Sequence, residues 1–270
     1  MPDPRFSVVV PAYNVERYIE ECLDSISAQG RDDVEVVVVD DGSTDSTSAI
    51  LERWAREQAF INLIRQSNKG LLAARRAGIA VTRGGYVLCV DGDDGLLPGA
   101  LDVLDGIIRE CAPDCITFSH TRRSGSLSRV AVVEDASFTQ SNRDEMISLL
   151  ARTRSLNSIW SKCVRRECMG VEDDFARFGR IQNGEDLIQS VSIIERSRSF
   201  AAIEAPLYYY RANEASITRT FRESDLSDVV VARGELHAFL ERECASPGLE
   251  RAACSVDYMQ AVDTAQSLCL

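Results

Sequence analysis

The chain has 270 residues, of which 45% are hydrophobic and 27% charged. This length and balance exclude a disordered or fibrous protein and allow one large domain, with or without an appendage. The 42 acidic residues outnumber the 30 basic ones, and the net charge of −12 makes nucleic acid an unfavourable partner. No apolar run approaches the roughly 20 residues of a membrane helix, and residues 1–13 lack the pattern of a secretory signal, so we expect a cytoplasmic protein.

The cysteines and histidines show no metal-ligand pattern. The nine cysteines are scattered and never spaced as a CxxC pair, which indicates reduced thiols in a reducing compartment. Cys22 and Cys89 are predicted to be small core residues. His120 and His237 are isolated and are predicted to be structural or surface residues.

The first half of the chain alternates between strand and helix patterns. Short, mostly β-branched or apolar runs predict strands at 6–10, 34–39, 62–65, 86–90 and 114–118. Between them, helical spacing predicts helices at 15–26, 46–57 and 71–79 and one opening near Pro98. Asn14 is placed to cap the first of these helices. Residues 1–118 are therefore predicted to form a doubly wound α/β half with a mostly parallel, Rossmann-like sheet, whose ligands bind at the carboxyl ends of the strands.

The second half is less regular. Residues 119–212 are expected to form a sub-region that completes a cleft, with a strand at the tyrosines 208–210, of which at least one is predicted to be core. Residues 213–270 are expected to be a mostly helical extension that carries more acidic than basic side chains, a poor electrostatic tether to an anionic membrane.

Two adjacent acids follow the second predicted strand. Asp40 and Asp41 would lie at the ligand-binding edge of a parallel sheet, Gly42 allows a tight turn, and residues 43–45 can cap the next helix. A plain turn with a helix cap explains the glycine and the caps but not the pair of acids. Binding is therefore the favoured interpretation.

The strand ending at Val90 leads into Asp91-Gly92-Asp93-Asp94. Like charges ~4 Å apart repel by about 4 kcal/mol per pair at an effective dielectric constant near 20. A divalent cation would remove this cost, and hard oxygen ligands suit Mg²⁺ or Mn²⁺. The alternative is a solvated acidic turn.

Asn68 and Arg75 lie at and just inside the start of the third predicted helix. Helix amino ends and guanidinium groups both favour phosphate oxygens. The alternative for Arg75 is a surface ion pair. Further along, Gly184 precedes Glu185 and Asp186 and an apolar helical pattern, which predicts a helix whose amino end presents both acids to the cleft. The alternative there is an ordinary acidic first turn.

Taken in order, these segments resemble family 2 glycosyltransferases of the GT-A fold, of the bacterial type that builds surface polysaccharides. The resemblance is carried in the first half by residues 11–14 (PAYN), 40–45 (DDGSTD), 68–70 (NKG) with Ala74-Arg75, and 91–94 (DGDD). In the second half it is carried by residues 160–162 (WSK), 184–186 (GED), 206–211 (PLYYYR) and 216–218 (SIT). Arg76 stands where the family often has Asn, and no role is assigned to it.

The resemblance implies a metal-dependent, inverting transfer of a sugar from a nucleotide-sugar donor, most commonly a UDP-sugar, to a saccharide or lipid-linked saccharide acceptor. It implies a donor site in which Tyr13 and Asp41 hold the base and Asp40 supports that edge of the site. Asn68 and Arg75 would approach the nucleotide, and Asp91 would contact the ribose or the sugar. Pro11 is included in the same site. Such an acceptor would allow a peripheral location at the inner face of a membrane.

The resemblance also assigns the reacting groups. Asp93 would ligate Mg²⁺ or Mn²⁺ with Asp94 beside it, and Asp186 would be the general base. This assignment agrees with general chemistry, because an inverting displacement needs a base opposite the departing diphosphate and a Lewis acid on that diphosphate. The residues expected on the acceptor side are Glu185, Trp160 and Lys162, with a core role for Trp160 as the alternative.

Two other functions remain open at this point. One is a noncatalytic sugar-nucleotide-binding partner in a polysaccharide assembly complex. The other is a nucleotidyltransferase, although residues 11–14 do not form the Gly- and Lys/Arg-rich phosphate loop expected there.

Overall fold

The computed structural model describes residues 3–122, 137–212 and 223–243, and the side chains of the last helix from residue 226 onward. The strands are β1 (Phe6–Ala12), β2 (Val34–Asp40), β3 (Ile61–Arg65), β4 (Tyr86–Cys89), β5 (Gly95–Leu96), β6 (Cys115–Arg122), β7 (Phe138–Asn142), β8 (Lys162–Arg165) and β9 (Ser199–Tyr210). The helices are α1 (Ile19–Ser27), α2 (Thr47–Glu57), α3 (Leu71–Ala80), α4 (Ala100–Cys111), α5 (Arg143–Arg152), α6 (Glu185–Arg196) and α7 (Glu223–Glu243), with 3-10 turns at Arg166–Met169 and Phe175–Phe178.

The strands form one mixed sheet in the order β3-β2-β1-β4-β8-β6-β9-β5, and β7 pairs with β9. Four strands of the first half, β3, β2, β1 and β4, are parallel to one another, which confirms the predicted mostly parallel α/β sheet, whereas β5 pairs antiparallel with β9. β8 from the second half runs antiparallel between β4 and β6. The two halves of the chain therefore share a single sheet.

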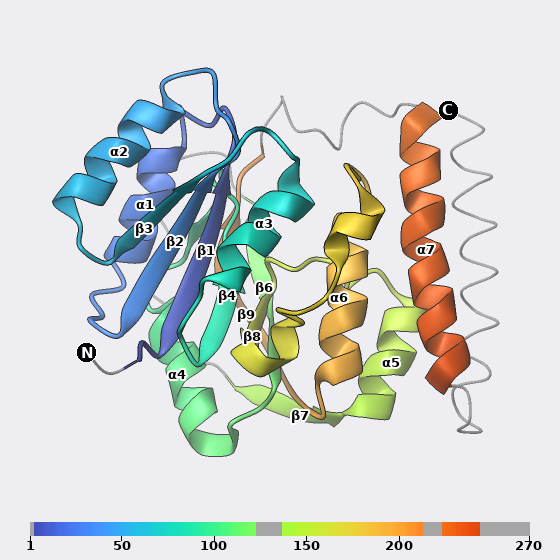
Figure 1. Cartoon of the computed structure of the whole chain (residues 1–270). Helices are drawn as coiled ribbons and strands as arrows, with labels where there is room; N and C mark the ends of the chain where they lie inside the picture. Colours follow the sequence, from blue (N-terminus) through green and yellow to red (C-terminus); the bar gives the residue numbers. More distant parts are fainter. Residues whose placement is uncertain (1–2, 123–136, 213–222, 244–270) are drawn as a thin grey trace.

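Helices cover both faces of this sheet (Figure 1). Residues on one face of β1 and β2, such as Val8 and Val36, pack in a cluster with α1, α2 and α4. Residues on the other face, such as Val9 and Val37, pack with α3, α5, α6 and α7. This double coverage is the reason that every residue of β1 is buried, as expected for a central parallel strand.

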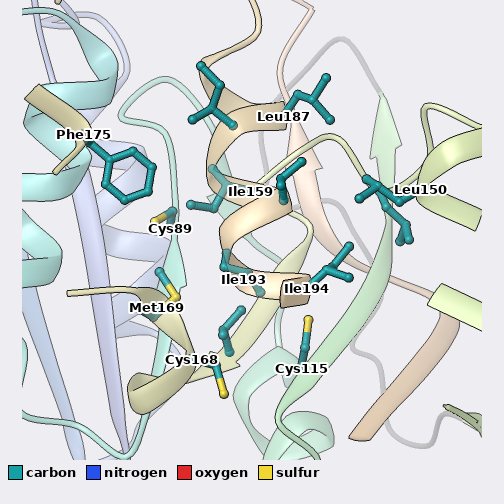
Figure 2. Close-up of a cluster of buried hydrophobic side chains, with 14 of the residues drawn as sticks. Cys89, Cys115, Leu150, Ile159, Cys168, Met169, Phe175, Leu187, Ile193 and Ile194 are labelled. Atoms are coloured by element: carbon teal, nitrogen blue, oxygen red, sulfur yellow. The ribbon is translucent and has the colours of Figure 1, made fainter. Parts of the chain in front are cut away.

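The second cluster is built around α6 (Figure 2). Leu187, Ile193 and Ile194 of α6 lie with Cys89 of β4 and Cys115 of β6. Cys89 is a buried free thiol, as is Cys22, so the predicted core role of both is confirmed. These contacts fix the position of α6 relative to the sheet.

The last helix belongs to the same core. Ala232, Leu236, Phe239 and Leu240 of α7 are buried in the cluster that contains α6. The predicted helical character of the carboxyl-terminal segment is confirmed for Glu223–Glu243, whereas 213–222 and 244–270 lie outside the described residues.

The predicted cap of α1 is wrong. The helix begins at Ile19, and Asn14 has a φ of 52° in a loop. Its Oδ1 accepts a hydrogen bond from the Thr44 N–H at 2.8 Å, and its N–H donates to the Ser43 hydroxyl at 3.2 Å. Asn tolerates the left-handed conformation better than most residues, and these distant partners replace the local ones that a cap would use.

Candidate active site

One edge of the sheet collects strand ends from both halves of the chain. β1, β2 and β4 run in the same direction and end at Ala12, Asp40 and Cys89. Because β8 is antiparallel to both β4 and β6, and β9 is parallel to β6, the start of β8 and the end of β9 lie at this same edge. We call it the carboxyl edge. It brings the acids after β2 and β4 to the side of the sheet where Lys162 begins β8 and Tyr210 ends β9.

Asp40 has a supporting role at this edge. It is 3% exposed. Its Oδ1 accepts a hydrogen bond from the Ser43 N–H at 2.9 Å, and its other oxygen accepts one from the Ser48 hydroxyl. The carboxylate therefore closes the turn after β2 and ties it to α2.

Asp41 is also buried, but it faces the segment that precedes α3. Its Oδ1 accepts hydrogen bonds from the Gln66 side chain at 2.7 Å and the Lys69 N–H at 2.8 Å, and its Oδ2 accepts one from the Gly70 N–H at 2.8 Å. A carboxylate has about four acceptor positions, so these three bonds leave capacity for a further donor.

Gly42 and Asn68 show how closely these two segments approach. Gly42 has a φ of 75°, and a Cβ there would lie 2.8 Å from the Asn68 backbone nitrogen. The Asn68 Oδ1 is buried and has no hydrogen-bond partner among the described residues. Since a buried unpaired acceptor costs about 1–3 kcal/mol, a ligand that donates to it would be stabilised.

Tyr13 presents its ring at the end of β1. It is 45% exposed, unusually high for a large aromatic side chain in this structure, and is available for stacking. The neighbouring Pro11 is buried, and its carbonyl accepts the Gly92 N–H at 3.2 Å. A Cβ on Gly92 would lie 3.0 Å from that carbonyl, so this glycine brings the acidic turn against β1.

The acidic turn after β4 is held from below by the end of β9. The Tyr208 hydroxyl donates to Asp94 Oδ2 at 2.7 Å and accepts the Asp91 N–H at 3.2 Å. The Arg211 N–H donates to Asp94 Oδ1 at 2.8 Å, and its Nε donates to the Asp93 carbonyl at 2.8 Å. Both oxygens of Asp94 are thus engaged within the protein.

The crowding of acids in this turn affects the ionisation of Asp94. Burial, together with the charges of Asp91 and Asp93, raises the pKa of Asp94 to about 8. In the described ranges, no group of three or more His, Cys, Asp or Glu side chains is arranged to hold a metal ion. The donor set nevertheless fits Mg²⁺ or Mn²⁺, since such ions commonly take one or two carboxylates and complete their shell with water and substrate phosphates.

Arg75 joins the acidic turn to the amino end of α6. Its Nη2 donates to both oxygens of Asp91 at 2.7 and 3.0 Å, and its Nη1 donates to Asp186 Oδ1 at 2.5 Å. The Arg75 side chain is 1% exposed, whereas those of Asp91 and Asp186 are 21% and 23% exposed. Arg75 is therefore a buried bridge rather than a surface ion pair, and the two carboxylates are the groups that reach solvent.

Asp186 is the second residue of α6. Gly184 precedes the helix with a φ of 90°, and Glu185 is the first helical residue, as predicted. Burial raises the pKa of Asp186; Arg75 opposes this shift, and the Asp91 charge adds to it. The Glu185 carboxylate lies 3.9 Å from Arg75, and burial and the Asp186 charge raise its pKa. A raised pKa makes a carboxylate a better proton acceptor near neutral pH.

Lys162 and Trp160 flank the site in different ways. Lys162 is 1% exposed, and its Nζ donates to the carbonyls of Leu156 and Ser158 at 2.7 and 2.5 Å. Burial lowers the pKa of Lys162 to about 8. Trp160 is half-buried and stacks on Tyr208 with ring centroids 4.8 Å apart. Lys162 therefore lies beneath the segment that carries Trp160.

Three residues make contacts at the candidate site that the sequence did not predict. His120, predicted to be an isolated structural or surface residue, packs edge-on against Trp160 with ring centroids 4.9 Å apart. Tyr208 and Arg211 were part of a recognised motif, but no contact with the acidic turn was predicted for them. Extending the strand at 114–118 by two residues would have placed His120 at the carboxyl edge.

Arg76 acquires a structural role. Its Nη1 donates to the Met169 carbonyl at 2.8 Å, its other terminal nitrogen donates to the Gly170 carbonyl, and its guanidinium lies 4.2 Å from the Phe175 ring centroid. Arg76 therefore attaches α3 to the turns after β8.

Comparison with known proteins identifies the family. The model of the family described as Glycosyl transferase family 2 matches residues 7–163, more than half of the chain. The chain belongs to glycosyltransferase family 2. The predicted resemblance to family 2 glycosyltransferases is thereby confirmed.

Curated relatives of this family 2 chain include the uncharacterized glycosyltransferase EpsJ of Bacillus subtilis, 30% identical over 80% of this chain and 63% of the relative. Glycosyltransferase GlyG of Streptococcus pneumoniae is 27% identical over 94% of this chain and 85% of the relative. Glycosyltransferase GlyA of the same organism is 30% identical over 86% of this chain but only 34% of the relative. The chain thus spans less than two thirds of the length of several relatives.

Solved structures share the fold. Residues 1–349 of TarS from S. aureus, in complex with UDP-GlcNAc, match with a TM-score of 0.68 and 22% identity over 86% of this chain and 66% of that one. The mannosyltransferase PcManGT of Pyrobaculum calidifontis, in complex with GDP-Man and Mn²⁺, matches with a TM-score of 0.51 and 20% identity over 98% and 81%. These matches confirm the predicted GT-A α/β fold.

None of the helices in the described ranges combines the length and apolar character that a transmembrane segment requires.

Proposed function

We propose that this chain transfers a sugar from a nucleotide-sugar donor to an acceptor hydroxyl, with inversion at the anomeric carbon. The observation that carries the proposal is the Arg75 bridge. It holds Asp91, on the donor side, and Asp186, on the acceptor side, against one guanidinium although they lie 95 residues apart in the chain. A displacement needs polar groups on both sides of the reacting carbon. On the donor side they respond to the charge that develops on the leaving group, and on the acceptor side a base takes the proton that leaves the nucleophile.

The donor site is proposed at the carboxyl edge between β1, β2 and the segment before α3. The Tyr13 ring would stack on the base, and Asp41 would accept a hydrogen bond from it. The buried Asn68 Oδ1 would accept one from the nucleotide. A UDP-sugar is the preferred donor; TarS structures contain UDP or UDP-GlcNAc, and PcManGT contains GDP-Man.

Asp93 would hold the divalent cation, with Asp94 beside it. Bound there, Mg²⁺ or Mn²⁺ supplies Lewis-acid neutralisation of the departing diphosphate. Asp91 is then placed to contact the ribose or sugar, and Arg75 keeps it oriented through two hydrogen bonds. The hydrogen bonds from Tyr208 and Arg211 hold the acidic turn in position before the donor arrives.

Asp186 would act as the general base. As the acceptor oxygen forms its bond to the anomeric carbon, the bond from that carbon to the diphosphate oxygen breaks, and the acceptor proton passes to the Asp186 carboxylate. The raised pKa of Asp186 suits this role. Glu185 would orient the acceptor or the base.

The acceptor is proposed to be a saccharide or a lipid-linked saccharide in polysaccharide synthesis. Trp160 would offer an aromatic surface to it, and Lys162 would act from beneath by fixing the segment that carries Trp160. Relatives with names in this field include a chondroitin synthase of Escherichia coli, 35% identical over 46% of this chain and 18% of the relative. A lipid-linked acceptor would bring the chain to the inner face of a membrane as a peripheral protein.

The test is a panel of nucleotide sugars incubated with the purified chain and Mn²⁺, with release of nucleoside diphosphate as the measurement. Turnover of one donor that is abolished by chelation supports the proposal. Binding of a nucleotide sugar with no turnover in the presence of acceptor extracts would instead indicate a noncatalytic sugar-nucleotide-binding protein. No metal-dependent binding of any nucleotide would refute the donor site.

A further inference from the structure

The turn that leads into Glu185 and Asp186 is held by the last helix. Asp228 of α7 accepts hydrogen bonds through one oxygen, Oδ2, from the backbone N–H groups of Gln182 at 2.8 Å and Asn183 at 3.3 Å. These two residues stand directly before Gly184 and the start of α6. A carboxylate that accepts two backbone N–H groups is a charge-assisted anchor, stronger than a neutral contact.

A second contact of α7 touches the next residue of the turn. A Cβ built on Gly184 would lie 2.5 Å from the Ala232 Cβ, so the backbone at Gly184 is pressed against α7. Ala232 is 1% exposed and stands four residues after Asp228, one turn further along the same face of the helix. The small side chain at 232 and the glycine at 184 together allow this close approach.

The rest of α7 is attached firmly enough to serve as a support. Its buried face joins the core around α6, where Leu187 lies one residue beyond Asp186 (Figure 2). Ion pairs join α7 to α5 and α6, namely Arg143–Glu243 and Arg242–Glu195. Figure 1 shows α7 running alongside α6 and next to α5.

We propose that α7 positions the general base, with Asp228 as the positioning residue. This inference rests on the proposed function of Asp186. Asp228 sets the path of residues 182–184, this path sets where α6 begins, and the start of α6 sets the carboxylates of Glu185 and Asp186 relative to Arg75. Asp228 contacts no reacting group itself. Its loss should therefore affect the transfer step and leave the donor site intact, because that site is proposed at the ends of β1 and β2, in the segment before α3 and in the turn after β4.

The experiment compares Asp228→Ala with Asp228→Asn and with the control Glu235→Ala. Glu235 lies on the same helix but forms an exposed ion pair with Arg177, and it is Asp228, not Glu235, that bonds to the backbone of residues 182 and 183. We expect Asp228→Ala to lower kcat by about tenfold or more, because small misplacements of a reacting group have large effects on rate, with donor KM changed less than about twofold. Asp228→Asn keeps an oxygen that can accept both N–H groups and should retain kcat within about threefold. Glu235→Ala should have wild-type kcat.

An equal loss of kcat in Asp228→Ala and Glu235→Ala, or wild-type kcat in Asp228→Ala, would overturn the inference. Should Asp228→Ala fail to fold, hydrogen exchange of the wild-type chain decides: the amides of Gln182 and Asn183 should be protected, and unprotected amides there would overturn the inference. If the wild-type chain turns over no donor, the proposed function fails on its own, while the exchange measurement still reports on the Asp228 contact.

Discussion

Replacement of Arg75 by Met is the sharpest test of the bridge at the centre of the site. Met keeps much of the aliphatic volume but removes the guanidinium, which donates three hydrogen bonds to Asp91 and Asp186. Removal of one partner from a buried ion pair costs about 3–5 kcal/mol. Because the two carboxylates keep 21% and 23% exposure, water replaces part of what is lost, and we expect the free energy of unfolding to fall by about 2–3 kcal/mol near pH 7.5.

The loss should depend on pH. Burial already raises the pKa of Asp186 and Glu185 in the folded chain, and Arg75 opposes that shift. Without the cation, their folded-state pKa values rise further. A carboxyl group whose pKa is higher in the folded chain than in the unfolded chain stabilises the fold at a pH below its unfolded pKa. That contribution is lost as the pH rises through its folded pKa. The loss of free energy of unfolding in Arg75→Met, relative to the wild-type chain, should therefore become smaller by about 1 kcal/mol or more when the pH is lowered from about 7.5 to about 5.

Urea unfolding followed by circular dichroism at the two pH values, without added metal, measures this effect. The matched control is Arg76→Met on the same helix. Arg76 donates to the carbonyls of Met169 and Gly170, which do not titrate, so its loss of stability should be equal at both pH values. A deficit in Arg75→Met that is below about 1 kcal/mol, or that does not change with pH, would refute the bridge as described.

Three further outcomes are expected. Asp186→Asn should retain donor binding in calorimetry and lose transfer by about 10²-fold or more, since the base acts only on the acceptor; transfer at the wild-type rate would exclude this base. Tyr208→Phe removes one hydrogen bond to Asp94 and one from the Asp91 N–H, and it should lower the free energy of unfolding measured in urea by about 1–3 kcal/mol. An unchanged midpoint of urea unfolding would contradict the role of Tyr208 in supporting the acidic turn. Since the pKa of Asp94 is raised to about 8, the stability that Asp94 contributes should decline as the pH rises towards 8. Mn²⁺ competes with protons for the carboxylates and should therefore raise Tm more near pH 8 than near pH 6. Equal shifts of Tm at the two pH values would count against a cation at this turn.

Local patterns were sufficient for the helices of the first half and for its strands other than the two-residue β5. The runs at 6–10 and 34–39 predict buried strands because continuous β-branched sequence suits a strand covered on both faces, and acids placed directly after such strands fall at the ligand edge. The same reasoning failed at Asn14, whose partners Ser43 and Thr44 lie about 30 residues away in the chain. A helix cap is predicted from neighbouring residues alone, so the prediction takes no account of a distant residue that binds the same side chain.

The sequence by itself determined the family, the order of the acidic segments and the residue types that the chemistry needs. Only the tertiary structure decided how they are joined: that Arg75 is a buried bridge to partners 16 and 111 residues away, that Tyr208 and Arg211 support the acidic turn from 117 residues beyond it, and that α7 touches the turn before Asp186. These contacts depend on strand order, above all on β8 lying antiparallel between β4 and β6. Periodicity reports which face of an element is buried, and it carries no information on which distant element covers that face.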